Sequence, residues 1–384
     1  MISDPETFSL LHDSIARFVR ERLIPAENRV AEEDAVPAEL VGEMRALGLF
    51  GLSVPRQYGG LELTLEETLL LVATLCQASP AFRSLIATNV GVGSQTLLMG
   101  GTEVQKQRYL PSIASGEMIV SFCLTEPEAG SDAASLRTRA VRDGDAYVLN
   151  GAKRFITNAP QAGLFTVMAR TDPARKGADG ISAFLVEAGT PGLSLGAPMK
   201  KMGQQGAHIC DVMFDDCRVP KENLLGEREG AGFKTAMQVL DKGRLHVAAV
   251  SIGIAERALQ EGLRYAAQRK QFGRPIGEFQ LVQAMLADSR ADIYAARCMT
   301  LDAARRRDLG EEITLEASCC KLFASEMCGR VVDRVVQIHG GAGYVAGHAA
   351  ERLYRDARIL RIYEGTSEVQ RLIIARELAR RHPG

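Results

Sequence analysis

The amino-acid sequence predicts an α+β protein with an N-terminal α-helical domain, a middle antiparallel β domain and a C-terminal helical bundle. Apolar residues recur at helical spacing through the first part of the chain, and no strand signal precedes Met118. Short runs rich in Val, Ile, Phe and Thr follow, separated by turn pairs, and long helical patterns with few breakers then fill the rest. We therefore place the domains at 1–118, 119–228 and 229–384. The 384 residues are enough for two or three domains with sizeable cores.

Capping residues mark the helix starts predicted in the first domain. Asp4 is a suitable N-cap and Pro5 suits the first helical position. Thr64 with Glu67, and Thr102 with Gln105, have the spacing of capping boxes. We expect helices from Pro5, over 38–47, from Thr64 to the Ser79-Pro80 pair, over 81–99, and after Thr102.

The middle domain is predicted to be a small sandwich or barrel of antiparallel strands. The Asp143-Gly144 and Asn150-Gly151 pairs are strong hairpin signals, because both residue types tolerate the left-handed backbone of a tight turn. The strands are expected at 136–141, 147–149, 164–169, 181–186 and 209–214.

Long helices are predicted for the third domain, over 248–269, 279–307 and 313–338. Their apolar spacing and few breakers are typical of an antiparallel bundle, which offers broad faces for self-association. A last helix is expected to run from about Ser367 to Arg381, opened by a capping box of Ser367 and Gln370.

Composition excludes several classes of function. The formal net charge of −1 gives no bulk attraction to nucleic acid or to an anionic membrane. The start of the chain has no basic segment followed by an apolar one, and no apolar run reaches membrane-spanning length, so we expect a cytoplasmic protein. The eight cysteines form no CxxC pair and have no histidine at metal spacing, so buried free thiols are expected and no metal site.

Glu364 is the candidate catalytic base. It lies in a turn just before the last predicted helix, where Gly365 permits a tight backbone and Ile362 and Tyr363 supply apolar surroundings. A carboxylate with little water around it is a stronger base. On these residues alone, the alternative is an ordinary helix-capping loop with a solvated glutamate.

The segment Cys123-Leu-Thr-Glu-Pro-Glu-Ala-Gly-Ser-Asp-Ala-Ala-Ser135 resembles the flavin-binding signature of the acyl-CoA dehydrogenase family. Physically it is a strand that runs into a loop of hydroxyls and small residues, which lets backbone amides approach a cofactor closely. Read without the resemblance, it is a surface loop rich in small residues. The resemblance continues in order through the segments 54–60, 153–158, 240–244, 269–274, 337–344 and 363–366.

The resemblance implies FAD as the cofactor and the family fold, in which the C-terminal domain is a four-helix bundle. Residues matching family positions around the flavin ring are Phe122, Leu124, Thr125, Ser131, Phe155, Ile156 and Thr157, with Thr125 and Thr157 as hydrogen-bond donors. Residues matching positions that reach the adenine and phosphates of an FAD held by a neighbouring subunit are Arg269, Gln271, Phe272, Gln337, Gly340 and Gly341. Thr366 and Glu368 match cofactor contacts near the catalytic turn.

The resemblance also implies the reaction. Ser131, Asp241 and Arg244 match positions lining an acyl-CoA channel, and Tyr363 and Gly365 flank the base at the substrate. Glu364 is then expected to remove the α-proton of an acyl-CoA while the β-hydride passes to FAD, giving a trans-2-enoyl-CoA. Some relatives carry the base on another helix, at the position that is Gly243 here, and glycine cannot serve. Further implied are a homotetramer, or dimer of dimers, and an electron-transfer flavoprotein as electron acceptor, with no nucleic-acid or membrane partner.

Two residues depart from the family pattern. Phe155 stands where most relatives have tryptophan, so a ring is kept but the indole N–H is lost. Gly347 stands where an acidic or amide residue is usual, which changes the local loop.

The acyl group is expected to be short, branched or functionalised. By analogy with the family, the helix at 81–99 is expected to form the floor of the acyl pocket. Its residues Thr88, Asn89, Val92 and Gln95 make that floor more polar than a long alkyl tail would favour. The alternative is that these residues face other helices.

Three other functions remain open on sequence. One is an acyl-CoA oxidase or lyase-like flavoenzyme of the same fold, although oxidases are generally longer. Another is a nucleic-acid-associated relative, for which Arg305 to Arg307 and Arg380-Arg381 are local basic clusters. The third is a catalytically silent scaffold.

Overall fold

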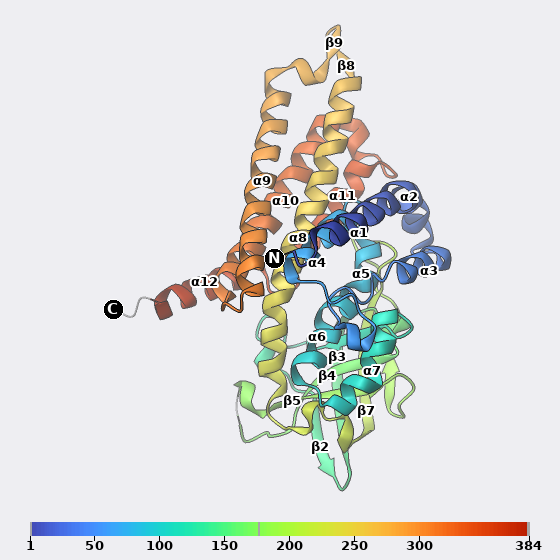
Figure 1. Cartoon of the computed structure of the whole chain (residues 1–384), viewed down its shortest axis with the longest axis vertical. Helices are drawn as coiled ribbons and strands as arrows, with labels where there is room; N and C mark the ends of the chain where they lie inside the picture. Colours follow the sequence, from blue (N-terminus) through green and yellow to red (C-terminus); the bar gives the residue numbers. More distant parts are fainter. Residues whose placement is uncertain (1, 176, 382–384) are drawn as a thin grey trace.

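The computed structural model describes residues 2–175 and 177–381, and it confirms the helical, β, helical order (Figure 1). The sheet lies at one end of the molecule and the long helices of the bundle extend to the other, with the N-terminal helices beside the junction. The α-helices before the sheet are α1 (Pro5–Phe18), α2 (Ile24–Glu33), α3 (Ala38–Ala46), α4 (Leu65–Leu75), α5 (Pro80–Thr88), α6 (Ser94–Gly100) and α7 (Glu103–Ser115).

Local capping chemistry positions these helices as predicted. The Asp4 side chain accepts from the Thr7 backbone N–H, and both predicted capping boxes, at Thr64 and at Thr102, are formed. Such caps satisfy backbone N–H groups that the first helical turn leaves unpaired.

Two predictions in this domain are wrong. The segment 81–99 is not one helix, because a π-helical turn, Asn89–Gly93, separates α5 from α6 and Gly91 leaves helical geometry there. Ser79-Pro80 does not end α4, which stops at Leu75; Ser79 instead caps α5 and Pro80 opens it. Helix α2 was not predicted, since a second π-helical turn, Val19–Leu23, joins it directly to α1.

The middle domain is one seven-stranded sheet in which β4 pairs with β1, β2 and β5. Most pairs are antiparallel, as predicted, but β1 runs parallel to β4, and β2 meets β4 in parallel at Arg139 and Arg170. The strands are β1 (Val120–Cys123), β2 (Arg139–Asp143), β3 (Ala146–Thr157), β4 (Leu164–Arg170), β5 (Ile181–Glu187), β6 (Leu193–Leu195) and β7 (Ile209–Pro220).

One of the two predicted hairpin turns is wrong. Asp143-Gly144 does join β2 to β3, but Asn150-Gly151 lies inside β3 at a β-bulge against β7. A Cβ on Gly151 would stand 2.5 Å from the Thr138 Oγ1. Glycine therefore allows the backbone at 151 to approach the segment before β2 closely.

The C-terminal bundle is built on α8, which runs through its centre. Helix α10 packs along α8 and α9, and their apolar faces form the largest core with residues of α4. The elements are α8 (Gly232–Gln268), the hairpin β8 (Lys270–Gln271) and β9 (Arg274–Pro275), α9 (Gln280–Asp308), α10 (Thr314–His339), α11 (Ala349–Ala357) and α12 (Ser367–Arg381).

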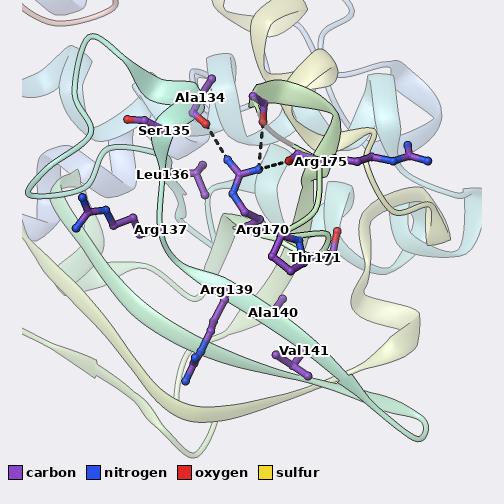
Figure 2. A pocket seen from close by; sticks show the side chains of 12 residues that line it. Ala134, Ser135, Leu136, Arg137, Arg139, Ala140, Val141, Arg170, Thr171 and Arg175 are labelled. Atoms are coloured by element: carbon purple, nitrogen blue, oxygen red, sulfur yellow. Dashed lines mark hydrogen bonds between the residues drawn. The ribbon is translucent and has the colours of Figure 1, made fainter.

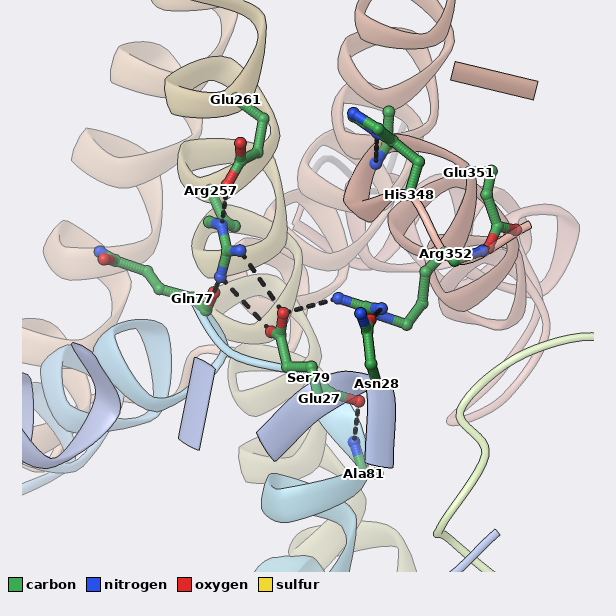
Figure 3. A network of polar contacts seen from close by, with 12 residues as sticks. Glu27, Asn28, Gln77, Ser79, Ala81, Arg257, Glu261, His348, Glu351 and Arg352 are labelled. Carbon is green, nitrogen blue, oxygen red and sulfur yellow. Dashed lines mark hydrogen bonds and ion pairs between the residues drawn. The ribbon is translucent and has the colours of Figure 1, made fainter. Parts of the chain in front are cut away.

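A buried ion-pair network joins the N-terminal domain to the bundle (Figure 3). Glu27 of α2 lies between Arg257 of α8, at 3.4 Å, and Arg352 of α11, at 2.6 Å. Arg257 also contacts Glu261 at 2.7 Å. All four side chains are buried, so each charge depends on its partners and the network fixes how the three helices meet.

All eight cysteines are free, and six of them are buried; Cys298 is exposed and Cys319 is partly buried. Within residues 2–175 and 177–381, no cluster of three or more histidine, cysteine, aspartate or glutamate side chains has the arrangement of a metal site. No helix in the same ranges is long and apolar enough to cross a membrane.

Candidate active site

The turn before α12 places Glu364 at the contact of three helices. Both Glu364 and Gly365 have positive φ, +56° and +88°, so the chain reverses sharply there. Glycine suits position 365 because φ is +88°, and a Cβ there would also stand 2.6 Å from the Gln370 side-chain nitrogen. The Lys321 Nζ of α10 donates to the Gly365 carbonyl at 2.6 Å and so holds the turn against α10.

The predicted capping box of Ser367 and Gln370 is wrong. The Thr366 hydroxyl accepts from the Val369 N–H at 3.2 Å and caps α12 instead. The Gln370 side chain donates to the carbonyls of Glu364 and Gly365, and the Ser367 hydroxyl donates to Glu326 at 2.6 Å. These bonds tie the turn to α10 and α12, and they position the base.

Glu364 has the electrostatics of a base. Burial raises the pKa of its carboxyl, while the positive charges of Arg83, Arg244 and Lys321 lower it, in that order of size. Its Oε2 is buried, and in the described part of the chain it meets no hydrogen-bond donor. The backbone N–H of Glu364 likewise has no acceptor among the described residues. Both groups are therefore available to a ligand.

Gly243 of α8 lies directly against the base. A Cβ added at Gly243 would stand 2.5 Å from the Glu364 Oε2. Position 243, where the resemblance places the base of some relatives, therefore adjoins the same space as Glu364, and the absence of a side chain at 243 leaves that space to Glu364.

The channel candidates Asp241 and Arg244 form an ion pair one helical turn apart on α8. Asp241 also accepts from the Thr314 hydroxyl at 3.0 Å. Arg244 is near enough to Glu364 to lower its pKa. Ser131, the third channel candidate, is exposed on the β-domain loop, and no described contact links it to these residues.

A buried carboxylate, Glu126, holds the loop that follows β1. It pairs with the buried Lys153 Nζ at 2.7 Å and accepts from the N–H groups of Arg137 and Thr138. Lys153 also donates to the Leu124 carbonyl at 3.3 Å. This hub fixes the loop on β3.

The loop and the end of β3 lie side by side, as the flavin assignment requires. The Arg154 N–H donates to the Thr125 carbonyl at 2.8 Å, and the Ser121 hydroxyl donates to the Thr157 carbonyl at 2.7 Å. Phe155 has φ +58° and is 54% exposed, with the Arg154 guanidinium over its ring at 5.2 Å from the centroid. The hydroxyls of Thr125 and Thr157, both partly exposed, have no partner in the described ranges.

These observations fit a flat aromatic cofactor with polar edges. Phe122 and Leu124 are partly buried near them, whereas the Ile156 side chain points into the β core, so only its backbone is available. Thr366 and Glu368 lie at the start of α12, with Glu368 exposed.

The remaining cofactor candidates lie elsewhere. Arg269, Gln271 and Phe272 are exposed around the β8–β9 hairpin, and Gln337, Gly340 and Gly341 are exposed at the end of α10. Figure 1 places this hairpin at the end of the bundle opposite the sheet, so these residues are not assembled with Phe155 within one chain.

An arginine-rich pocket of about 630 Å³ opens on the β domain but does not include the base (Figure 2). Arg170 at its centre donates to the carbonyls of Ala134, Arg175 and Gly177, and so stabilises the pocket wall. Arg139 also lines it and is exposed. We assign this pocket no part in the site around Glu364.

Sequence reasoning missed three residues that the structure brings to the site: Arg83, Lys321 and Glu126. Each is a charged residue inside an otherwise apolar or small-residue segment, which is the signal that marks them. This sequence signal does not identify the residues that these charges contact, because those contacts depend on how the elements pack.

The three-domain arrangement, with a partly buried carboxylate before α12 and a hydroxyl-bearing loop after β1, defines a class of protein, the flavin-dependent oxidoreductases of acyl thioesters. Models of the acyl-CoA dehydrogenase N-terminal, middle and C-terminal domains match residues 5–117, 121–217 and 230–379. The chain belongs to the acyl-CoA dehydrogenase family.

Similar proteins agree with this membership. A probable acyl-CoA dehydrogenase of Bacillus subtilis is 42% identical, over 96% of this chain and 97% of its own. Butyryl-CoA dehydrogenase from Megasphaera elsdenii superposes with a TM-score of 0.93 at 36% identity, covering 98% of each chain. A chain from a structure of the electron transferring flavoprotein of Acidaminococcus fermentans gives 0.94 at 41% identity, again covering 98% of both.

Proposed function

We propose that this protein binds FAD and oxidises an acyl-CoA thioester to the trans-2-enoyl-CoA, with Glu364 as the base. The observation that carries the proposal is the Glu364 carboxylate, whose Oε2 is buried without a donor and faces the side-chain-free position Gly243. A carboxylate in this setting accepts a carbon-bound proton better than a solvated one, because burial raises its proton affinity.

The residues proposed to hold the flavin ring are Thr125, Phe155 and Thr157, with Thr366 at the start of α12. Their support is the exposed ring of Phe155 and the unpartnered hydroxyls. When bound, FAD supplies a hydride acceptor, which amino-acid side chains cannot provide.

The chain itself would orient and deprotonate the substrate. The unpaired Glu364 N–H is available to the thioester carbonyl, and such a donor stabilises the charge that develops on the oxygen as the α-proton leaves, by about 3 kcal/mol. Lys321 holds the turn, so the N–H and the carboxylate keep their mutual placement. The Asp241–Arg244 pair and Ser131 are proposed to line the path of the CoA moiety.

Assembly and electron transfer complete the proposal. The exposed cofactor candidates at the β8–β9 hairpin are proposed to meet FAD bound by a second copy, in a homotetramer. An electron-transfer flavoprotein in the cytoplasm is the proposed acceptor, supported by the similar chain from a structure of such a protein.

The test is the Glu364→Gln variant, which keeps the side-chain shape but has no basic oxygen. We expect FAD binding and acyl-CoA binding to remain, and anaerobic reduction of the flavin by butanoyl-CoA to slow by at least about 10³-fold. Glu364→Asp is the matched control, since it keeps the carboxylate on a shorter side chain and should retain part of the activity.

Full activity of Glu364→Gln would contradict the assignment of the base. Purified protein without FAD would contradict the dehydrogenase itself. Rapid reoxidation of the reduced protein by oxygen, with one hydrogen peroxide per turnover, would identify an oxidase instead.

A further inference from the structure

Arg83 of α5 is a buried guanidinium with no anionic partner in contact. Only 9% of the residue is exposed, and in the described part of the chain it makes no hydrogen bond and no ion pair. Burying an arginine without a partner is costly, so a charge in this position needs a compensating group.

The Arg83 charge acts on residues of the turn that carries Glu364, and on His246. Burial raises the pKa of Tyr363 to about 12, and Arg83 gives the largest opposing effect, as it does for Glu364. Burial, with the charges of Arg83 and Lys242 adding to its effect, lowers the pKa of His246 on α8 to about 3. Arg83 therefore lies within electrostatic reach of both Glu364 and a neutral His246.

The other two cations near Glu364 have partners. Arg244 is paired with Asp241, and the Lys321 Nζ donates to the Gly365 carbonyl. Arg83 differs, because no carboxylate of the described residues, Glu364 included, comes within ion-pair distance of its guanidinium. Of these three cations, Arg83 is therefore the one without a partner in the described part of the chain.

The polar residues first expected to shape the acyl pocket are already used by the protein. The Asn89 side chain bonds to Ile113, Met118 and Val120 of the backbone, and Thr88 accepts from Asn158. Gln95 accepts from Lys242 and donates to Ser53. Unlike these three side chains, Arg83 is engaged by no described residue and is free to bind a ligand.

We propose that Arg83 binds a carboxylate at the far end of the acyl group, so that the substrate is a short, carboxyl-terminated acyl thioester. This inference rests on the proposed function. A guanidinium recognises a carboxylate with two parallel hydrogen bonds, which fixes direction as well as distance. Anchored there, the acyl chain is held with its α-carbon toward Glu364. An uncharged acyl chain of the same length leaves Arg83 buried and unpaired.

The test compares acyl thioesters of equal carbon count with and without the terminal carboxylate. Binding of pentanoyl-CoA and of 4-carboxybutanoyl-CoA is measured by calorimetry on FAD-loaded Glu364→Gln, which does not turn over, and flavin reduction is measured on the wild type. We expect the carboxylated ligand to bind Glu364→Gln at least about 30-fold more tightly, and Arg83→Met to abolish that preference.

Two further variants serve as controls. One tests whether the positive charge alone is enough without the paired donors of the guanidinium, and the other tests whether removing any arginine has the same effect. Arg83→Lys keeps the charge but not the paired donors, and is expected to retain only part of the preference. Arg139→Met, in the arginine-rich pocket of the β domain, is expected to leave it unchanged.

The outcomes distinguish the two proposals. If pentanoyl-CoA reduces the flavin as well as its carboxylated counterpart, and Arg83→Met does not change their ratio, the inference about Arg83 fails while the dehydrogenase stands. If Arg83→Met loses FAD, Arg83 is a cofactor contact and the inference also fails. If no acyl-CoA of either kind reduces the flavin, the proposed function fails.

Discussion

At the scale of single residues, Asp356 of α11 is a buried acid whose titration is expected to affect stability. Only one of its carboxyl oxygens has a partner, the Gln204 N–H, while Oδ2 has none in the described part of the chain. Burial raises its pKa from 3.8 to about 6, although Gln204, Arg352 and Arg355 each lower it. The folded protein therefore favours the protonated acid.

The sign of the pH effect follows from this shift. Because the folded pKa lies above the unfolded one, the contribution of Asp356 to stability is complete below about pH 4 and is lost as the pH rises through about 6. A shift of about two units corresponds to roughly 3 kcal/mol. Asp356→Asn keeps the acceptor but cannot ionise, so its free energy of unfolding relative to wild type should increase by about that amount from pH 4 to pH 7.

Urea unfolding of both FAD-loaded proteins across this pH range measures the difference. Titrations elsewhere in the protein are common to the two and cancel. A difference that stays constant with pH would show that Asp356 titrates normally in the folded state.

At the scale of elements, the packing of α8 against the turn before α12 decides where a base can stand. Gly243 and Glu364 adjoin the same space, with 2.5 Å between an added Cβ and the Oε2. Removing the carboxylate by Glu364→Gly should abolish activity. Adding Gly243→Glu to that variant should restore part of it, since the new side chain enters the vacated space from the other helix.

Flavin reduction by butanoyl-CoA compares the two variants. The single variant Gly243→Glu is the control and should be poorly active, because two carboxyl groups do not fit there. A double variant as inactive as Glu364→Gly, with normal FAD content, would show that a side chain at position 243 of α8 does not reach the substrate.

At the scale of the whole molecule, the free end of the bundle is an exposed surface that contains cofactor candidates. Phe272 is 93% exposed in the turn between β8 and β9, and Tyr344 is 86% exposed after α10. Large apolar side chains that are this exposed are candidates for contacts between subunits. This end lies opposite the sheet in Figure 1, which agrees with a cofactor shared between two copies.

Phe272→Asp should therefore weaken both assembly and FAD retention, because a buried charge in an apolar interface is unfavourable. Light scattering gives the mass and the flavin absorbance gives the FAD content. Leu10→Asp, an exposed apolar residue on α1, is the control and should change neither. An unchanged mass with full FAD for Phe272→Asp would exclude this end of the bundle as an interface.

Much of the fold was predictable because its signals are local. The capping boxes at Thr64 and Thr102 depend on residues three positions apart, and each opens a helix where expected. The hairpin signal at Asn150-Gly151 failed because the role of Gly151 is set by Thr138, which directly precedes β2. Short local patterns do not contain such partners.

The sequence by itself determined the family, the helical, β, helical order, and the candidate base with a glycine after it, because these follow from motifs contiguous in the chain. Only the tertiary structure decided what surrounds the base. Gly243, Lys321 and Arg83 come from three separate helices, and their meeting at Glu364 depends on how those helices pack. The unpartnered charge of Arg83 likewise became visible only there, since burial and ion pairing are properties of packed side chains.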